Sequence, residues 1–137
     1  MDGLIIKEKW LNLILSGEKI WEVRGSACHK EQGTRIGLIQ SGTSEIACEM
    51  AQKALGMPLD SNYLLCRGQA VFMGCFPLTK EIYEQFRERH CIVLPYEKLP
   101  YKKPYVWVLR RAMSYEKPVP VKYPKGAVIW LKNCIEN

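Results

Sequence analysis

The stretch that decides the fold is KEKWLNLILSGEKIWEVRG, residues 7–25. Apolar residues recur here at the spacing of one helical face, at Ile6, Trp10, Leu13 and Ile14. Gly17 follows them, where the end of a helix favours a left-handed residue. Residues 19–25 then alternate with a period of two, which predicts a short strand. We therefore expect a helix, a tight turn and a strand in direct succession.

Outside this unit, strand-like and helix-like runs are interleaved. Strands are predicted at 3–6, 34–42, 67–76, 105–112 and 127–133, with an extended proline-bearing run at 115–126. Helices are predicted at 44–56 and 78–90, the second capped by Thr79. The fold class expected is α+β, mainly β: a small closed or nearly closed barrel of five to six strands with two to three helices. The length fits a single domain over residues 1–137.

Composition is that of a globular protein, with 47% hydrophobic and 25% charged residues. No apolar run is long enough to span a bilayer, and the N-terminal apolar stretch is too short for a signal peptide. We therefore expect a soluble, cytoplasmic protein with no membrane partner.

The six cysteines are spaced irregularly and form no C-x-x-C motif, so we expect free thiols. The pairs Cys28-His29 and His90-Cys91 are the only candidates for a metal site with two cysteines and two histidines. Adjacent side chains on a strand point to opposite faces, so both members of a pair rarely reach one ion. We predict neither a metal nor another cofactor, and read these cysteines as small buried hydrophobic residues.

The net charge of +6 is unevenly distributed. Nine basic residues lie between Lys98 and Lys132 with only Glu116 to oppose them, which gives that segment +8; the rest of the chain carries −2. Such a basic segment is typical of proteins that bind nucleic acid. A solvated lysine face that maintains solubility is the alternative.

The opening stretch also carries a family resemblance. WLNLILSGEKIWEVRG is similar to the N-terminal signature of ASCH domains, members of the PUA-like superfamily, which runs W-x-x-x-I-L-x-G-x-K-x-x-E-x-R. The matching residues are Trp10, Ile14, Leu15, Gly17, Lys19, Glu22 and Arg24. Residues 33–42 and 105–132 also look like the family, in the same order.

The resemblance implies a PUA-like β-barrel with the first helix beside it, and a cleft lined by Lys19, Glu22 and Arg24. Such domains are associated with RNA or other nucleic-acid binding. Some relatives are hydrolases that deacetylate an acetylated cytidine, and ribonuclease activity has been proposed for others. The deacetylating group carries a threonine where this chain has Glu22, so its constellation is not intact here. Residues 44–65 are also longer than usual, and their helix either caps the cleft or contacts a partner protein.

Close charges beside Ile20 and Trp21 need partners, because an isolated buried ion is costly. One interpretation is an ion-pair network that stabilises the barrel mouth. The other is a receptor for a nucleotide: Lys19 and Arg24 donate to a phosphate or a carbonyl, and Glu22 accepts from the exocyclic amine of a base.

Aromatic residues complete such a receptor, because bases stack on them. Candidates are Trp10, which the signature places at the cleft, with Tyr105 and Trp107; Trp107 and Trp130 are also candidates for the core. Ser41 and Thr43 end a strand and can meet a phosphate or sugar, although a plain turn explains them equally well. Arg67 is a further candidate for a phosphate contact.

The sequence leaves open whether the chain is an enzyme. Lys19 and Glu22 can act as an acid–base pair if burial lowers the pKa of the lysine. No nucleophile elbow, H-E-x-x-H motif or Walker loop is present. The first hypothesis is an RNA- or nucleotide-binding domain in RNA processing or regulation. The alternatives are a hydrolase of a modified nucleoside or of RNA, and a scaffold that contacts a protein through the helix at 44–56.

Overall fold

The structure, a computed structural model, describes residues 1–42, 44–124, 126 and 129–136. The elements run in the order β1 (Gly3–Ile6), α1 (Glu8–Leu15), β2 (Trp21–Arg24), β3 (Thr34–Gln40), α2 (Glu45–Leu55), β4 (Tyr63–Pro77), α3 (Lys80–Gln85), α4 (Arg87–His90), the 3-10 turn Tyr96–Lys98, β5 (Tyr105–Lys122) and β6 (Trp130–Leu131). No helix among these residues is long and apolar enough to cross a membrane.

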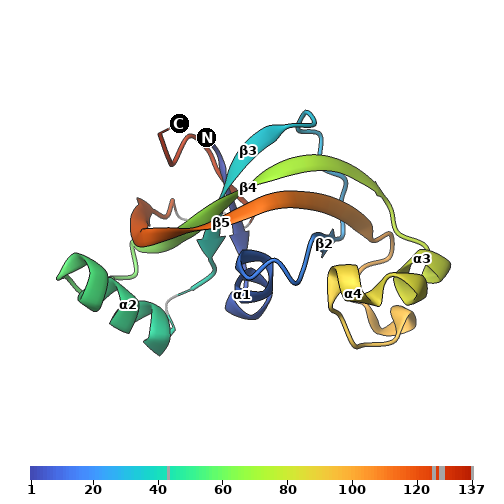
Figure 1. Cartoon of the computed structure of the whole chain (residues 1–137). Coiled ribbons are helices and arrows are strands. Elements are labelled where there is room, and N and C mark those ends of the chain that lie inside the picture. The colour runs from blue at the N-terminus through green and yellow to red at the C-terminus, as the bar shows by residue number, and fades with distance from the viewer. Residues whose placement is uncertain (43, 125, 127–128, 137) are drawn as a thin grey trace.

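The six strands form one mixed sheet in the order β2-β5-β4-β3-β1-β6. β1 pairs parallel with β3, and the other neighbours pair antiparallel. Figure 1 shows β4 and β5 as a curved arch, with the helices beneath it and the two termini close together. The predicted α+β, mainly β class is thus confirmed. The described residues show no ladder between the edge strands β2 and β6, so the sheet curls as a half-barrel.

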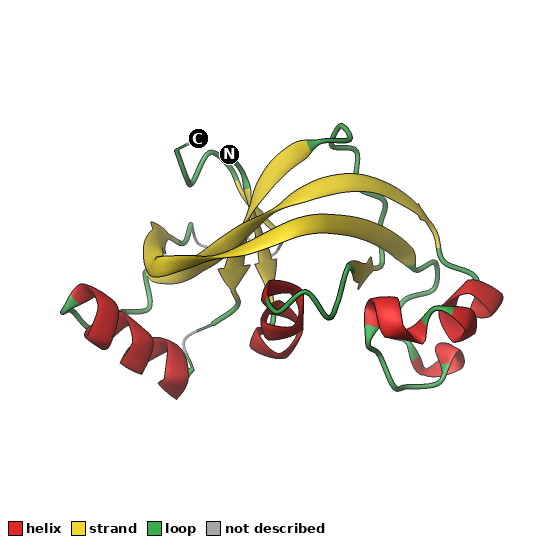
Figure 2. Cartoon of the chain, in the orientation of Figure 1, coloured by secondary structure: helices red, strands yellow, loops and turns green. Residues whose placement is uncertain are grey.

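The helices differ in number from the prediction. The run 78–90 begins at the expected cap, where the Thr79 hydroxyl accepts from the backbone of Ile82. It then breaks at Phe86, whose φ of −118° and ψ of 40° leave the helical region. The break divides the run into α3 and α4, so the described chain holds four α-helices rather than two or three. Figure 2 shows all of them on one side of the sheet.

The strands β4 and β5 are longer than predicted. β4 covers 15 residues and β5 covers 18, because the proline-bearing run 115–122 continues the strand that starts at Tyr105. Register shifts interrupt their ladder at three places, which bends the pair. The sheet is curved in this way, and α1 packs against its concave side.

Two hydrophobic clusters fix the position of the predicted helix–turn–strand unit. The first holds the buried face of α1, Leu11 and Ile14, against β3, β4 and β5. The second holds Trp21 and Val23 of β2 against α3 and the segment after α4. Trp10 contacts both clusters, so one indole joins α1 to the neighbourhood of α4. Gly17 has a φ of +85°, the left-handed conformation expected at the helix end.

Candidate functional site

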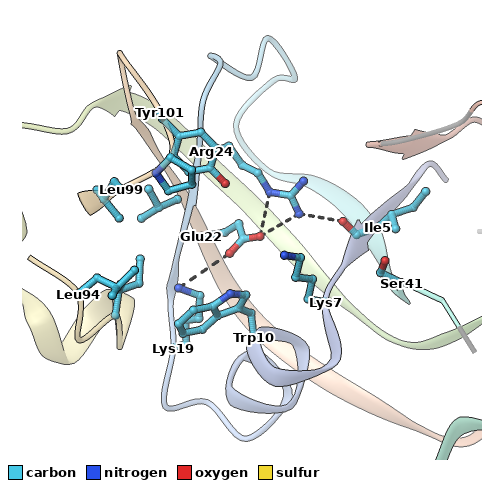
Figure 3. Close-up of a pocket in the computed structure, with 13 residues that line it drawn as sticks. Ile5, Lys7, Trp10, Lys19, Glu22, Arg24, Ser41, Leu94, Leu99 and Tyr101 are labelled. Atoms are coloured by element: carbon cyan, nitrogen blue, oxygen red, sulfur yellow. Dashed lines mark hydrogen bonds and ion pairs between the residues drawn. The ribbon is translucent and has the colours of Figure 1, made fainter. Parts of the chain in front are cut away.

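The charged residues of the signature converge at a cavity of about 380 Å³. Figure 3 shows Glu22 at its centre, with Lys19 on one side and Arg24 on the other. The Nε and Nη2 atoms of Arg24 lie 2.9 and 2.8 Å from Glu22 Oε2, and Lys19 Nζ lies 3.8 Å from Oε1. The charge trio formed by Lys19, Glu22 and Arg24 is therefore one connected ionic group.

β2 and the turn before it set this geometry. Glu22 and Arg24 lie on the same face of the strand at i and i+2, as the alternation predicts. Lys19 precedes the strand and does not follow the alternation, so it reaches the Glu22 face rather than the opposite one. Trp21 meanwhile packs among Phe76 and Phe86 on the other side. The indole of Trp21 thus belongs to a face that does not carry the charges.

Lys19 is the most deeply buried cation of the trio, with 1% of its surface exposed. Its ammonium donates to the carbonyl of His90 at 2.5 Å and lies 4.7 Å from the centre of the Trp10 ring. Burial lowers its pKa to about 8, although the nearby Glu22 carboxylate and the Cys91 thiol oppose the shift. Lys19 can therefore exchange a proton near neutral pH while it stays beside Glu22.

His90 belongs to the wall behind Lys19 rather than to a reacting group. Its Nδ1 accepts from the backbone of Ile92, and its Nε2–H donates to the carbonyl of Tyr83. Burial lowers the pKa of His90, which favours this neutral form. Both ring nitrogens are thereby engaged. Among the described residues no group of three or more metal-ligating side chains gathers, and the six cysteines are free thiols.

The opposite wall of the cavity is apolar and was missed from the sequence. It comes from the segment after α4 and comprises Ile92, Leu94, Leu99, Pro100 and Tyr101. Ile5 and Lys7, at the end of β1 and the start of α1, also line the cavity. The signal available in the sequence was the run IVLPYEKLPY, residues 92–101, whose apolar content is high for a loop.

The structure brings together only part of the predicted set. Trp10, Lys19, Glu22, Arg24 and Ser41 all line the cavity. Tyr105 lies on β5 opposite Arg24 in the ladder but lines a different, shallow depression beside Lys102 and Lys103. Thr43 lies outside the described residues.

Trp107 and Arg67 are placed elsewhere. Trp107 is 1% exposed in the core, where it stacks on Trp130 and donates to the carbonyl of Ser26. It supports the site from behind, since Arg24 lies 5.7 Å from its ring centre. The Arg67 guanidinium donates to Asn12 and Gln40 instead of facing the cavity.

The helix α2 does not cap the cavity either. Ser44 caps its N-terminus and also donates to Glu8 of α1 at 2.6 Å. Ala47 and Ala51 bury its inner face against Leu65, while 56% of Ile46 is exposed. None of its residues lines the cavity, so contact with a partner protein stays the open prediction for this helix.

The comparison with solved structures supports the fold. No family model and no curated protein matches the sequence. Among solved structures, the chain is similar to a mutant of ZmASCH, the ASCH protein of Zymomonas mobilis, with a TM-score of 0.60 and 12% identity over 86% of this chain and 73% of that one. A second mutant gives a TM-score of 0.59 at 11% identity over 86% and 72%, and ZmASCH itself gives 0.55 at 12% over 82% and 68%. The chain therefore has the fold of an ASCH domain, as its signature predicts.

Proposed function

We propose that this chain binds RNA, or a single nucleotide within it, through the cavity that the charge trio lines. The observation that carries the proposal is the trio itself: a nearly buried carboxylate between two cations, set at an open cavity with an apolar wall opposite. Glu22 has 6% of its side chain exposed, yet only Oε2 is closely engaged by Arg24. Among the described residues the one ion-pair partner of Oε1 is Lys19 Nζ at 3.8 Å, so this oxygen can accept from the amino group of a base.

The basic segment 98–132 supplies general attraction for the phosphate backbone. Its eight described basic residues are all exposed (Lys98, Lys102, Lys103, Arg110, Arg111, Lys117, Lys122 and Lys132). Only Lys132 among them forms an ion pair in the described part of the chain, with Asp2 at 3.6 Å. Exposed, unpaired cations release counterions when they meet phosphates, which favours binding at low salt. A role in RNA processing or regulation follows from such binding.

Single-stranded RNA with a fluorescent label tests this function by anisotropy. We expect affinity to fall steeply with added salt, with a log–log slope of about −0.7 for each phosphate neutralised. Glu22→Gln should weaken binding, whereas Arg67→Gln, which removes a charge outside the cavity, should leave it almost unchanged. No binding to single-stranded RNA at low salt would defeat the proposal.

One observation favours a second function, hydrolysis of a modified nucleoside or of RNA. The pKa of about 8 gives Lys19 a neutral fraction near pH 7 to 8, and Glu22 Oε1 lies 3.8 Å from its Nζ, so the two groups are adjacent acid–base candidates. Incubation with acylated cytidines and with RNA separates the two functions. Turnover that disappears in Lys19→Ala, with the fold preserved by circular dichroism, supports the enzyme; binding without turnover supports the binding domain.

A further inference from the structure

The cavity has two chemically different ends. Figure 3 shows Leu94, Leu99 and Tyr101 on one side of Glu22, and Lys7 with Ser41 on the other. The first side is the apolar wall from the segment after α4, and the second is formed where β1 and β3 end. A ligand that matches both ends is therefore apolar at one end and polar at the other.

Tyr101 offers the ring that is available for stacking. Two lysines, Lys9 and Lys19, each lie 4.7 Å from the Trp10 ring centre, so cations already lie over this indole. In the part of the chain that the structure describes, neither a cation nor another aromatic ring lies over Tyr101, and 36% of it is exposed. Its ring rests against Gly25, where a Cβ would come within 2.7 Å. The absence of a side chain at Gly25 thus leaves room for the Tyr101 ring at the edge of the cavity.

Lys7 offers the cation that is available for an anion. Lys19 and Arg24 are already engaged by Glu22, and by the carbonyls of His90 and Ile5 respectively. Lys7 is exposed and has neither an ion pair nor a hydrogen bond from its ammonium among the described residues. The hydroxyl of Ser41 beside it is also exposed and without a described partner. The free capacity to bind an anion therefore lies at the Lys7 end.

The volume and the net charge of the cavity also suit a nucleotide. A volume of about 380 Å³ lies near the lower end of roughly 300–1,000 Å³ for ligand pockets, so it suits one nucleotide unit better than a length of chain. The charged lining residues Lys7, Lys19, Arg24 and Glu22 sum to +2, which favours an anion.

We propose that the cavity holds one nucleoside monophosphate in a single orientation, with its base on Tyr101, an amino group of the base at Glu22 and its phosphate at Lys7 and Ser41. This inference rests on the proposed function and assigns its ligand class and the direction in which the ligand lies. The unit is either a free nucleotide or the phosphorylated end of an RNA.

Isothermal titration calorimetry with 5′-CMP and with cytidine tests the orientation, because the pair differs only in the phosphate. The wild-type chain should bind 5′-CMP about tenfold more tightly than cytidine at low salt. Lys7→Gln should abolish that difference while cytidine affinity stays the same. Lys9→Gln removes the same charge two residues further along the chain, at a residue that does not line the cavity. This control variant should keep the difference in affinity between 5′-CMP and cytidine.

Tyr101→Leu should weaken both ligands by about tenfold, and Tyr101→Phe should restore them, because stacking needs the ring but not the hydroxyl. A short oligonucleotide with and without a 5′-phosphate shows whether the bound unit is free or an RNA end; a phosphate preference in either form supports the inference. If wild-type binds 5′-CMP but Lys7→Gln keeps the preference, or Tyr101→Leu keeps the affinity, the orientation is wrong and the proposed function stands. If wild-type binds neither RNA nor any mononucleotide, both are overturned.

Discussion

Two polar clusters flank α1, and they are built from similar residues. One is the charge trio; the other, the α1–α2 network, comprises Glu8, Asn12, Gln40, Ser44 and Arg67. In the network Arg67 donates to Asn12 and Gln40, and Gln40 and Ser44 donate to Glu8. These hydrogen bonds run between secondary-structure elements, and none of the network's members lines the cavity. The trio instead keeps an acceptor oxygen open toward a cavity, which is the property a binding site needs.

The comparison shows that position, rather than residue type, distinguishes the two clusters: only the trio lines the cavity. A carboxylate, a guanidinium and further polar groups occur in both clusters. The network joins α1 to the cap of α2, so its hydrogen bonds hold elements together. The trio lies at the edge strand β2, where the next layer is an apolar loop segment rather than another polar group.

The largest expected effect is on stability, from Glu22→Gln. Loss of this carboxylate leaves Lys19 and Arg24 as like charges in a site where Lys19 is almost wholly buried. Removing one partner of a buried ionic group costs about 3 kcal/mol or more. Glu8→Gln, the matched change in the network, should cost about 1 kcal/mol, because the groups that donate hydrogen bonds to Glu8, on Gln40 and Ser44, are neutral. Urea unfolding of the two variants measures the difference, and equal losses would remove the distinction between the clusters.

The next largest effect is expected in the pH dependence of the free energy of unfolding, measured for wild-type and for Lys19→Met. Because the folded-state pKa of Lys19 is lowered from 10.5 to about 8, the unfolded chain binds more protons at this site between those two values. The free energy of unfolding of wild-type should therefore rise relative to Lys19→Met from pH 8 to pH 10.5, by about 3 kcal/mol in total. Below pH 8 the difference should be constant. A difference that stays flat throughout would show that Lys19 is not desolvated.

How much of this could be read from the sequence differs between the two clusters. The signature brought Trp10, Lys19, Glu22 and Arg24 to one cavity because it is a local unit: a helix, a turn and a strand within residues 8–24 fix their mutual positions. Arg67 could not be placed in this way. Its surroundings come from α1 and β3, which the sheet pairing brings beside β4, and no local pattern encodes that contact.

The same limit explains why the sequence did not predict the positions of Trp107 and Tyr101. Trp107 lies between Val106 and Val108 on β5, so the alternation does not mark an outer face, and only the fold shows that the Trp107 face packs against α1. Tyr101 lies in a loop without periodicity, and it reaches the cavity because Gly25 leaves room for its ring. A loop contact of this kind depends on the tertiary structure alone.

Arg67→Gln should have a moderate effect that is confined to stability. It removes hydrogen bonds to Asn12 and Gln40, at a cost of about 1 to 2 kcal/mol. RNA affinity should change less than twofold, since Arg67 lies outside the cavity lining. Thermal unfolding and anisotropy on the same preparation measure both properties. A large loss of affinity at unchanged stability would transfer the site from the trio to the network.

Gly25→Ala should give the smallest change and the most local one. The added methyl group displaces the Tyr101 ring from its position against Gly25. Because 36% of Tyr101 is already exposed, the free energy of unfolding should change by less than about 1 kcal/mol. Nucleotide affinity should fall a few-fold. Gly33→Ala serves as the control, because nothing lies near its Cβ position and it is outside the cavity, although its φ of +92° adds a backbone cost of its own. Equal nucleotide affinities for Gly25→Ala and Gly33→Ala would show that the position of the Tyr101 ring does not affect binding.

The most direct test of the central claim is a titration of the ¹⁵N-labelled chain with short single-stranded RNA, followed by NMR. The account predicts that the shift changes concentrate at the cavity, in the indole N–H of Trp10 and the backbone of Gly25 and Tyr101, while the Gln40 side-chain amide of the α1–α2 network stays still. Shift changes centred on Gln40 and Arg67, with the cavity signals unmoved, would contradict it.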